Sequence, residues 1–483
     1  DYALRVCEVS RSVGHIPKVL YHWRASPSST AASGLNKPSS FDAGRRAVQD
    51  CINRQGIDAL VSQPDWAAKE GLGIFKPTFP DNGPSVTIII PTRNNAKLLK
   101  RCLASLELTT YQNFSVTIID NESDDPETLD LLQETKHRVL RIPHKKNKFN
   151  FSYLVNKGME ESSSKYVLLL NDDTEVLAPC WLSQMVGYLS IDGVGVVGAK
   201  LLFPDGRIQH AGIINGILDG LPAPAFRGFD GKDAGYLNYL RVARNYKAVT
   251  AACLLTTRKL FKEIDGFDES NLAVAYNDVD FCYRVIEHAK KRCVYCPDAQ
   301  LIHKEGSSRG SKDDYNEIFY FKERYGNQRD PYFSPNFSSV NANYSIIPFC
   351  LPLPYQSMVN VLAITHNLNL EGAPLSMMEM ITGLFKMGKI KPRVISLKDG
   401  PLREAYEALG ISVRVLSFDA LDCSARYYNS HLSRWSEKVR IRDCEMVYAN
   451  TMNCFFGIDA AHKENVPSVW NIRESSYAKE SFG

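Results

Sequence analysis

The chain has 483 residues, of which 44% are hydrophobic and 23% charged, and its formal net charge at pH 7 is +3. This composition is typical of a globular protein with enough apolar residues for two to four packed domains. This net charge is too small, and the charged residues are too evenly spread, to indicate a nucleic acid or an anionic membrane surface as partner. No apolar run approaches the ~20 residues that a membrane-spanning helix needs.

Twelve cysteines are spread along the chain without a repeating framework, which favours a reducing compartment and a cytoplasmic location. The alternative is that the protein acts at the inner face of the membrane. Cys293 and Cys296 have the spacing of a redox or zinc pair. Because there is no second pair and the segment 292–297 has the pattern of a strand, we expect these two to be structural thiols.

The first residues resemble a later part of the same chain. Residues 1–6 match residues 280–285 in type at nearly every position, and residues 16–22 resemble residues 296–303. The repeat predicts that residues 1 to about 33 are the end of an upstream copy of the central domain. Helical spacing over residues 45–54 predicts a linking helix, so the region 1–79 is expected to hold this remnant and a helical linker.

A turn-rich break at residues 80–84 opens the central region, which is predicted to span residues 80–330. Short apolar runs predict strands, and segments with helical spacing predict helices between them. The expected strands are residues 86–90, 116–119, 139–142 and 167–170. The first expected helix spans residues 98–106, with Asn94 or Asn95 as its cap. A second helix is expected to begin at Asp125 and Pro126, and a third to span residues 151–159. This β-α-β-α-β alternation predicts an α/β fold with a parallel, doubly wound sheet.

Two adjacent carboxylates, Asp172 and Asp173, follow directly after the apolar run 166–170. Ligands of open α/β sheets bind beyond the carboxyl ends of the strands, where these side chains and Asp120 are expected to meet. Neighbouring carboxylates repel each other unless they share a cation, which indicates a divalent metal and a phosphorylated ligand. The alternative is that one of them only caps a following helix. Residues 91–94 stand where a dinucleotide-binding domain would carry G-x-G-x-x-G, which disfavours that class.

The second half of the central region supplies two further candidates. Strands are predicted over residues 194–200 and 249–256, and a helix begins near Asn277. Asp278 lies outside the apolar stripe of this helix, so it is either a favourable first-turn carboxylate or a general base that faces a pocket. His303, at the end of another predicted strand, is either a surface histidine or a metal ligand.

In their order and spacing these motifs resemble the inverting family 2 glycosyltransferases of the GT-A fold, from residue 84 to about residue 325. The segments that carry the resemblance are residues 88–94, 119–121, 170–176, 198–200, 204–206, 266–269, 277–280 and 301–303. The resemblance implies an enzyme with a nucleotide sugar as donor and a divalent metal, Mn²⁺ or Mg²⁺, as cofactor. A histidine among the ligands would favour Mn²⁺.

The resemblance also implies which residues bind the donor. Thr92 and Asn94 would line the nucleotide pocket, and Asp120 would bind the base or the ribose. Asn171 and Asp172 belong to the DxD-type site of the family, and Asp172 would lie near the donor sugar or the ribose.

The resemblance implies the remaining roles in the same way. Asp173 is expected to ligate the metal, His303 matches the position where some members supply a further ligand, and Asp278 matches the catalytic base. The chain departs from the family where glycine is common, at Ala251 and at Glu122. A methyl group at Ala251 would narrow the donor pocket if it faced the sugar.

The last part of the chain differs in character. Proline punctuates a predicted linker over residues 331–357, and residues 358–483 follow. The expected strands are residues 359–365, 394–397, 413–416 and 446–449. The segment resembles the N-terminal, acceptor-side half of a family 4 GT-B glycosyltransferase, a Rossmann-like domain whose loop glycine near the donor phosphates would be Gly372.

These observations favour a glycosyltransferase that adds a sugar to a hydroxyl of a growing polysaccharide or lipid-linked glycan, such as an O-antigen. Its partners would be the nucleotide-sugar donor and the glycan acceptor, with peripheral membrane contact through the acceptor. The alternative is a non-catalytic carbohydrate-binding or scaffolding domain, which would be expected to lose Asp173, Asp278 and His303 first. A nucleotidyltransferase would need a basic, glycine-rich signature that residues 91–94 do not form.

Overall fold

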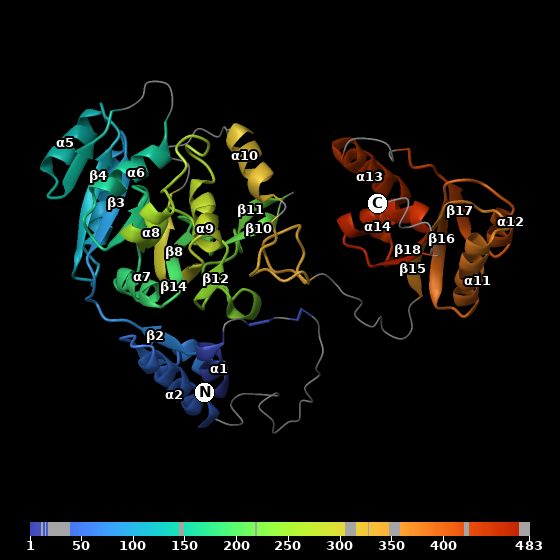
Figure 1. Cartoon of the computed structure of the whole chain (residues 1–483), viewed down its shortest axis with the longest axis horizontal. Coiled ribbons are helices and arrows are strands. Elements are labelled where there is room, and N and C mark those ends of the chain that lie inside the picture. The colour runs from blue at the N-terminus through green and yellow to red at the C-terminus, as the bar shows by residue number, and fades with distance from the viewer. Residues whose placement is uncertain are drawn as a thin grey trace. The chain divides into compact units, whose positions relative to one another are not determined.

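Figure 1 shows the computed structural model, which describes residues 1–10, 13–14, 16–17, 39–143, 149–217, 220–304, 315–326, 328–346, 358–419 and 425–472. The chain divides into two compact units, residues 1–345 and residues 346–483, and each is described by itself. The division falls inside the segment 331–357 that the sequence predicts to be a linker.

The first unit is built on a ten-stranded mixed sheet with the order β12-β14-β8-β13-β6-β3-β4-β5, to which β7 and β9 add at β14 and β8. Its strands are β3 (Val86–Thr92), β4 (Phe114–Asp120), β5 (Arg138–Arg141), β6 (Tyr166–Leu170), β7 (Thr174–Val176), β8 (Val194–Leu202), β9 (Ile208–His210), β12 (Arg244–Tyr246), β13 (Cys253–Thr257) and β14 (Arg292–His303). The strands β3 to β6 pair in parallel, as predicted. β13 runs antiparallel between β6 and β8, so the sheet is mixed in its other half. The α/β class expected for the central region is confirmed.

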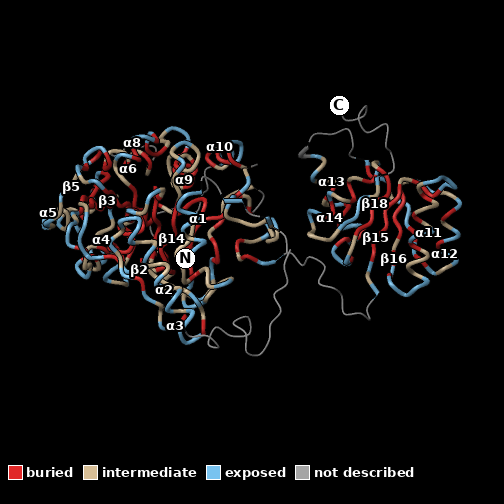
Figure 2. Tube along the Cα trace, turned by 60° about the horizontal axis from the view of Figure 1, so that its bottom comes forward, coloured by how far each residue is buried: buried red, intermediate tan, exposed pale blue. Residues whose placement is uncertain are grey.

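Helices cover both faces of this sheet. They are α4 (Ala96–Leu106), α5 (Pro126–Glu134), α6 (Phe151–Glu161), α7 (Trp181–Ser190), α8 (Arg258–Glu263), α9 (Asn277–Glu287) and α10 (Tyr315–Tyr325). Ile88 and Ile90 of β3 belong to the core that contains α4 and α7, whereas Ile89 belongs to the core that contains α6, α8, α9 and α10. Successive strand residues point to opposite faces, and both faces are covered, so the central strands are apolar at nearly every position. Figure 2 shows these buried strand residues.

The segment before the sheet contains α1 (Tyr2–Val9), α2 (Ser39–Arg54), β1 (Leu60–Ser62), α3 (Asp65–Lys69) and β2 (Lys76–Thr78). The predicted linking helix is present and begins earlier than expected, at Ser39. Arg5 Nε donates to Asp1 Oδ2 at 2.9 Å, and Arg284 Nε donates to Asp280 Oδ2 at 2.8 Å, so the repeated sequences form the same ion pair. Residues 18–22 of the second repeated segment lie outside the described residues.

One predicted strand begins later than expected. The sequence predicts a strand over residues 249–256, whereas β13 begins at Cys253 and residues 251–252 form a turn. The backbone N–H groups of Thr250 and Ala251 donate to side chains, not to a neighbouring strand. The remaining small elements are β10 (Ile213–Ile217), β11 (Leu221–Pro224) and the 3-10 turn η2 (Tyr236–Asn238).

The second unit is a five-stranded sheet with the order β17-β16-β15-β18-β19, in which every pair is parallel. Its elements are β15 (Val359–Thr365), α11 (Gly372–Lys386), β16 (Ile390–Ser396), α12 (Leu402–Glu407), β17 (Ser412–Val415), α13 (Ala425–Val439), η3 (Ile441–Asp443), β18 (Met446–Asn450), η4 (Met452–Cys454), α14 (Phe455–Lys463) and β19 (Ser468–Asn471). This strand order is that of a Rossmann-like half-domain, in which the order reverses between β15 and β18. Membership of the GT-B class stays a prediction.

Within the described parts of both units, no helix combines the length and apolarity needed to cross a bilayer.

Candidate active site

The acidic motif and His303 meet because of one strand pairing. After residues 171–173 the chain continues as β7, which pairs antiparallel with the end of β14 and places Thr174 opposite His303. As a result, His303 Nε2 lies 3.1 Å from Asp173 Oδ1. The alternative that the motif caps a helix is wrong, because β7 follows the motif and α7 begins only at Trp181.

The imidazole of His303 is oriented by Gln209 on β9. Gln209 Nε2 lies 3.3 Å from the carbonyl oxygen of His303, and Gln209 Oε1 lies 2.6 Å from His303 Nδ1. Gln209 Oε1 thus holds the Nδ1 side of the ring, and the Nε2 side faces Asp173 and the amide of Asn171, whose Nδ2 lies 3.2 Å away. Metal-ligating histidines characteristically have their second ring nitrogen held in this way.

Asp172 takes a different position from its neighbour. Its Oδ2 accepts from Thr92 Oγ1 at 2.7 Å and from Asn95 Nδ2 at 3.0 Å. Burial raises the pKa of Asp172 to about 6, against the two hydrogen bonds, which lower it, while the nearby charge of Asp173 raises it further. Asn95 does occupy the cap position of α4, but its side chain makes no cap bond there. Sequence reasoning placed Asn95 only at a helix end, so its contact with Asp172 was missed.

Asp120 lies beside Thr92, because β3 and β4 pair in parallel with these two residues opposite each other. Its carboxylate is almost completely buried; Oδ1 accepts from Ser123 N at 2.9 Å, and Arg141 Nη1 lies 3.3 Å from Oδ2. Asp120 thus joins the acidic motif through Thr92, which donates to Asp172. The proximity of Arg141 was not predicted; its position in β5, next to β4, was the available signal.

Asn94 connects two loops at the same edge of the sheet. It has a left-handed conformation with φ 49°, and its Oδ1 accepts from Asp124 N at 2.9 Å and from Asp125 N at 3.1 Å. The described contacts of Asn94 therefore hold the loop that follows β4. Glu122, where the family resemblance leads one to expect glycine, is also left-handed with φ 54°. Glycine adopts this conformation without steric cost, which explains why it is favoured there.

The turn that precedes β13 links the remaining candidates. Thr250 N donates to His210 Nε2 at 3.2 Å, and Ala251 N donates to Asp278 Oδ2 at 2.8 Å. Asn171 N in turn donates to the carbonyl oxygen of Ala252 at 3.1 Å. Asp278 is therefore joined to the acidic motif through neighbouring residues of one turn.

The side chains of His210 and Ala251 attach this turn to the core of the unit. Burial lowers the pKa of His210 to about 4, so its neutral ring accepts from Thr250 at Nε2 and donates from Nδ1 to the Ala199 carbonyl. Ala251 is 3% exposed and its methyl group belongs to the core cluster that contains α9. The N–H of Ala251, not its methyl group, makes the described contact with Asp278.

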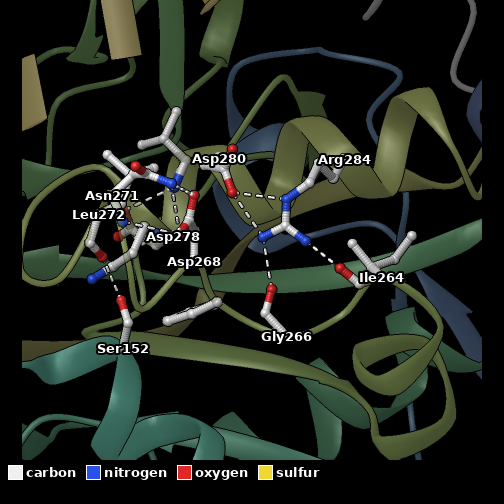
Figure 3. A network of polar contacts seen from close by, with 12 residues as sticks. Ser152, Ile264, Gly266, Asp268, Asn271, Leu272, Asp278, Asp280 and Arg284 are labelled. Atoms are coloured by element: carbon white, nitrogen blue, oxygen red, sulfur yellow. Dashed lines mark hydrogen bonds and ion pairs between the residues drawn. The ribbon is translucent and has the colours of Figure 1, made fainter. Parts of the chain in front are cut away.

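Asp280 has a structural role that separates it from Asp278. It is completely buried, and Arg284 binds it in addition to the carbonyl oxygens of Ile264 and Gly266 (Figure 3). Tyr325 donates to its second oxygen at 2.6 Å. Both of its oxygens therefore hold neighbouring segments in place, whereas Asp278 is only half-buried.

The structure thus brings together Asn171, Asp173 and His303 directly, and joins Asp172, Thr92, Asp120 and Asp278 to them through neighbouring residues. Within the described ranges, no group of three or more histidine, cysteine or acidic side chains converges on one point. The donor set of Asp173 and His303 fits a divalent ion whose other ligands are phosphate oxygens and water, as is usual for Mg²⁺.

Comparison with known proteins shows that part of this site is similar to a known family. Residues 87–264 match the model of the family described as glycosyl transferase family 2. An uncharacterized protein of Sinorhizobium fredii is 39% identical over 354 residues, which are 70% of this chain and 38% of that protein. The O-antigen biosynthesis protein RfbC of Myxococcus xanthus is 32% identical over 345 residues, which are 70% of this chain and 26% of that protein.

Among solved structures, a mannosyltransferase from Pyrobaculum calidifontis in complex with GDP-Man and Mn²⁺ aligns with a TM-score of 0.34 and 16% identity, over 57% of this chain and 68% of that one. The chain spans well under half the length of the two sequence relatives. The match to the family runs from β3 through α8 and includes Thr92, Asp120 and the acidic motif. Residues 87–264 of the first unit therefore match a glycosyltransferase domain of family 2.

Proposed function

We propose that the first unit transfers a sugar from a nucleoside-diphosphate sugar to a hydroxyl group of a growing polysaccharide or lipid-linked glycan, with inversion at the anomeric carbon. The observation that carries this proposal is the 3.1 Å approach of His303 Nε2 to Asp173 Oδ1 at the carboxyl edge of the sheet. It supports a site for a divalent ion, the partner that a diphosphate leaving group needs.

The separation of the two atoms fits shared coordination. Ligands about 2.1 Å from one ion and at right angles to each other lie ~3 Å apart. With Gln209 Oε1 accepting from Nδ1, a neutral His303 would present the lone pair of Nε2 to such an ion in place of the Asn171 amide. A bound Mn²⁺ or Mg²⁺ would neutralise charge on the diphosphate as it leaves.

The neighbouring residues would hold the rest of the donor. Asp120 and Thr92 lie side by side at the ends of two parallel strands, where a nucleoside would rest. Asn171 contributes an amide next to His303, and Asp172 is fixed by Thr92 and Asn95 so that it does not swing toward Asp173.

Asp278 would act as the general base. Its carboxylate takes the proton of the acceptor hydroxyl while the hydroxyl oxygen forms a bond to the anomeric carbon. The bond from that carbon to the diphosphate breaks on the opposite side, and its electron pair leaves with the diphosphate. The N–H of Ala251 holds Asp278 Oδ2 at 2.8 Å and so fixes the direction of the carboxylate. A correctly placed base contributes ~10²- to 10⁴-fold to the rate.

The names of two relatives support the proposed class of acceptor. One of them is named for O-antigen biosynthesis, and another, 27% identical over 128 residues, is named as a glucosyltransferase that acts on an undecaprenol-linked glycan in Campylobacter jejuni. These names support a polysaccharide or lipid-linked acceptor for the present chain.

A donor screen tests the proposal. The full chain is incubated with Mn²⁺ and UDP-glucose, UDP-galactose, UDP-N-acetylglucosamine, GDP-mannose or dTDP-rhamnose in separate reactions, and the released nucleoside diphosphate is measured. Release from at least one donor, abolished by EDTA and restored by Mn²⁺, is the expected result. Release that is unaffected by EDTA would contradict the metal site.

A further inference from the structure

The helix that carries Asp278 begins in an uncommon backbone conformation. Tyr276, the residue before α9, is left-handed with φ 59° and ψ 1°. A bulky residue adopts this conformation at a cost in free energy, and it persists only where the surrounding structure holds it in place. Asp278 follows two residues later, so whatever fixes Tyr276 also fixes the start of the helix that presents the base.

α10 supplies the contacts that hold this segment. Glu317 is 4% exposed, and its two carboxylate oxygens accept from the backbone N–H groups of Val274 at 3.0 Å and Ala275 at 2.5 Å. Phe321, one turn further along α10, stacks on the ring of Tyr276 with a centroid distance of 4.9 Å and an interplanar angle of 26°. One helix therefore binds three consecutive residues directly before α9.

The same helix contacts α9 and the preceding loop at two other points. Tyr325 donates to Asp280 Oδ1 at 2.6 Å, next to the ion pair of Asp280 with Arg284. Tyr320 donates to Asp268 Oδ2 at 3.1 Å. The loop that Asp268 and Arg284 stabilise in Figure 3 is therefore attached to α10 as well.

We propose that Glu317 is a positioning residue for Asp278. The inference rests on the proposed function, because it assigns a role to Glu317 in the reaction of that site. Glu317 holds residues 274–275, which keeps Tyr276 left-handed and aims the first turn of α9 so that Asp278 meets the N–H of Ala251. Without Glu317 the segment relaxes, and the base moves relative to the acceptor. Displacement by about 1 Å is enough to cost ~10²-fold in rate.

The variant Glu317→Gln tests this role, because it keeps the shape of the side chain but replaces one acceptor oxygen by a donor. The control is Glu323→Gln, an exposed glutamate on the same helix. Both full-length variants are compared with the wild type in kcat and donor KM, with the nucleotide sugar that is most active in the donor screen. Hydrogen exchange of the amides of Val274 and Ala275 is measured in parallel.

The expected result for Glu317→Gln is a fall in kcat of roughly 10- to 100-fold with an unchanged donor KM, and faster exchange at both amides. In the background of Asp278→Asn the same substitution should cause no further loss, since both act on one step. A normal kcat, or an equal further loss in that background, would overturn the inference.

Failure of the proposed function gives a different result. If the wild type releases no diphosphate from any donor, the proposed function is contradicted, while hydrogen exchange still reports whether Glu317 holds the segment. If Asp278→Asn is fully active but Glu317→Gln is impaired, Glu317 acts on something other than the base, and the inference is also wrong.

Discussion

The mixed sheet of the first unit and the parallel sheet of the second carry different side chains where their parallel strands end. In the first unit the strand ends supply Asp120, the acidic motif and His303, and His303 Nε2 lies 3.1 Å from Asp173 Oδ1. In the second unit the strand ends supply Thr365, Ser396, Asn450 and Asn471, which are neutral. The described contacts of these neutral groups are with each other and with backbone carbonyls: Asn450 Nδ2 donates to the carbonyl oxygen of Ala373 in α11 at 2.9 Å, and Asn471 Nδ2 donates to Asn450 Oδ1 at 3.1 Å.

This difference shows that the topology of a sheet determines where a ligand can bind. The side chains at the strand ends determine whether a cation is needed there. Neutral amides and hydroxyls satisfy one another without a further partner. Adjacent buried carboxylates repel each other and favour a shared cation. The first unit is therefore expected to depend on a divalent ion, and the second unit is not.

The largest effect is expected from Asp173→Ala. Removal of this ligand leaves His303 alone to hold the ion, and metal-dependent release of diphosphate should fall by roughly 10²- to 10³-fold, as it does when one stabiliser of developing charge is lost elsewhere. The fall is measured as the steady-state release of nucleoside diphosphate in the presence of Mn²⁺. Asp50→Ala, at an exposed position of α2, is the matched control and should behave as the wild type. Equal activity of Asp173→Ala and the control would contradict the metal site.

Asp278→Asn should separate chemistry from donor binding. The amide oxygen can still accept from Ala251 N, which keeps the contact with the turn, whereas the bond from Val279 N to Oδ1 is lost and the side chain no longer takes a proton. Transfer to the acceptor is expected to fall by ~10²- to 10⁴-fold. The donor KM, measured by steady-state release of nucleoside diphosphate, should stay unchanged. Normal transfer by this variant would show that the base lies elsewhere.

Gln209→Leu should weaken the metal site without removing a ligand. Loss of the acceptor for His303 Nδ1 frees the imidazole to rotate and to change tautomer, and Mn²⁺ affinity should fall by roughly 10- to 100-fold. Titration with Mn²⁺, followed by the activity at each concentration, measures the shift. An unchanged Mn²⁺ dependence would mean that Gln209 does not orient the ring.

Asn450→Ala in the second unit should leave donor turnover by the first unit unchanged. It removes both amide contacts of a completely buried side chain, so a local loss of stability of about 1–3 kcal/mol is expected. Faster hydrogen exchange in the first turn of α11 would report it. A large loss of donor turnover in this variant would break the distinction between the two edges.

Much of the sheet was predictable because its strands are buried on both faces and so form uninterrupted apolar runs, as in β3 and β6. The position of Asp172 and Asp173 at the sheet edge followed from that pattern. The meeting of Asp173 with His303 was expected only from the family resemblance, since it depends on the pairing of β7 with β14. The spacing of residue types along the sequence does not reveal an antiparallel pairing between such distant segments.

Other parts of the site depend on contacts that leave no periodic trace in the sequence. Gln209 lies in a three-residue strand, Asn95 has the pattern of an ordinary helix cap, and Glu317 that of an ordinary helix residue. The late start of β13 arises because Thr250 and Ala251 donate to His210 and Asp278, and residue types do not show this. In each case a tertiary hydrogen bond, not local propensity, fixes the role.

Binding of Mn²⁺ to the full chain in the presence of UDP or GDP, followed by isothermal titration, tests the central claim most directly. The account predicts one Mn²⁺ site in the wild type that is lost in Asp173→Ala, weakened in Gln209→Leu and retained in Asn450→Ala. Equal Mn²⁺ binding by the wild type and Asp173→Ala would contradict it.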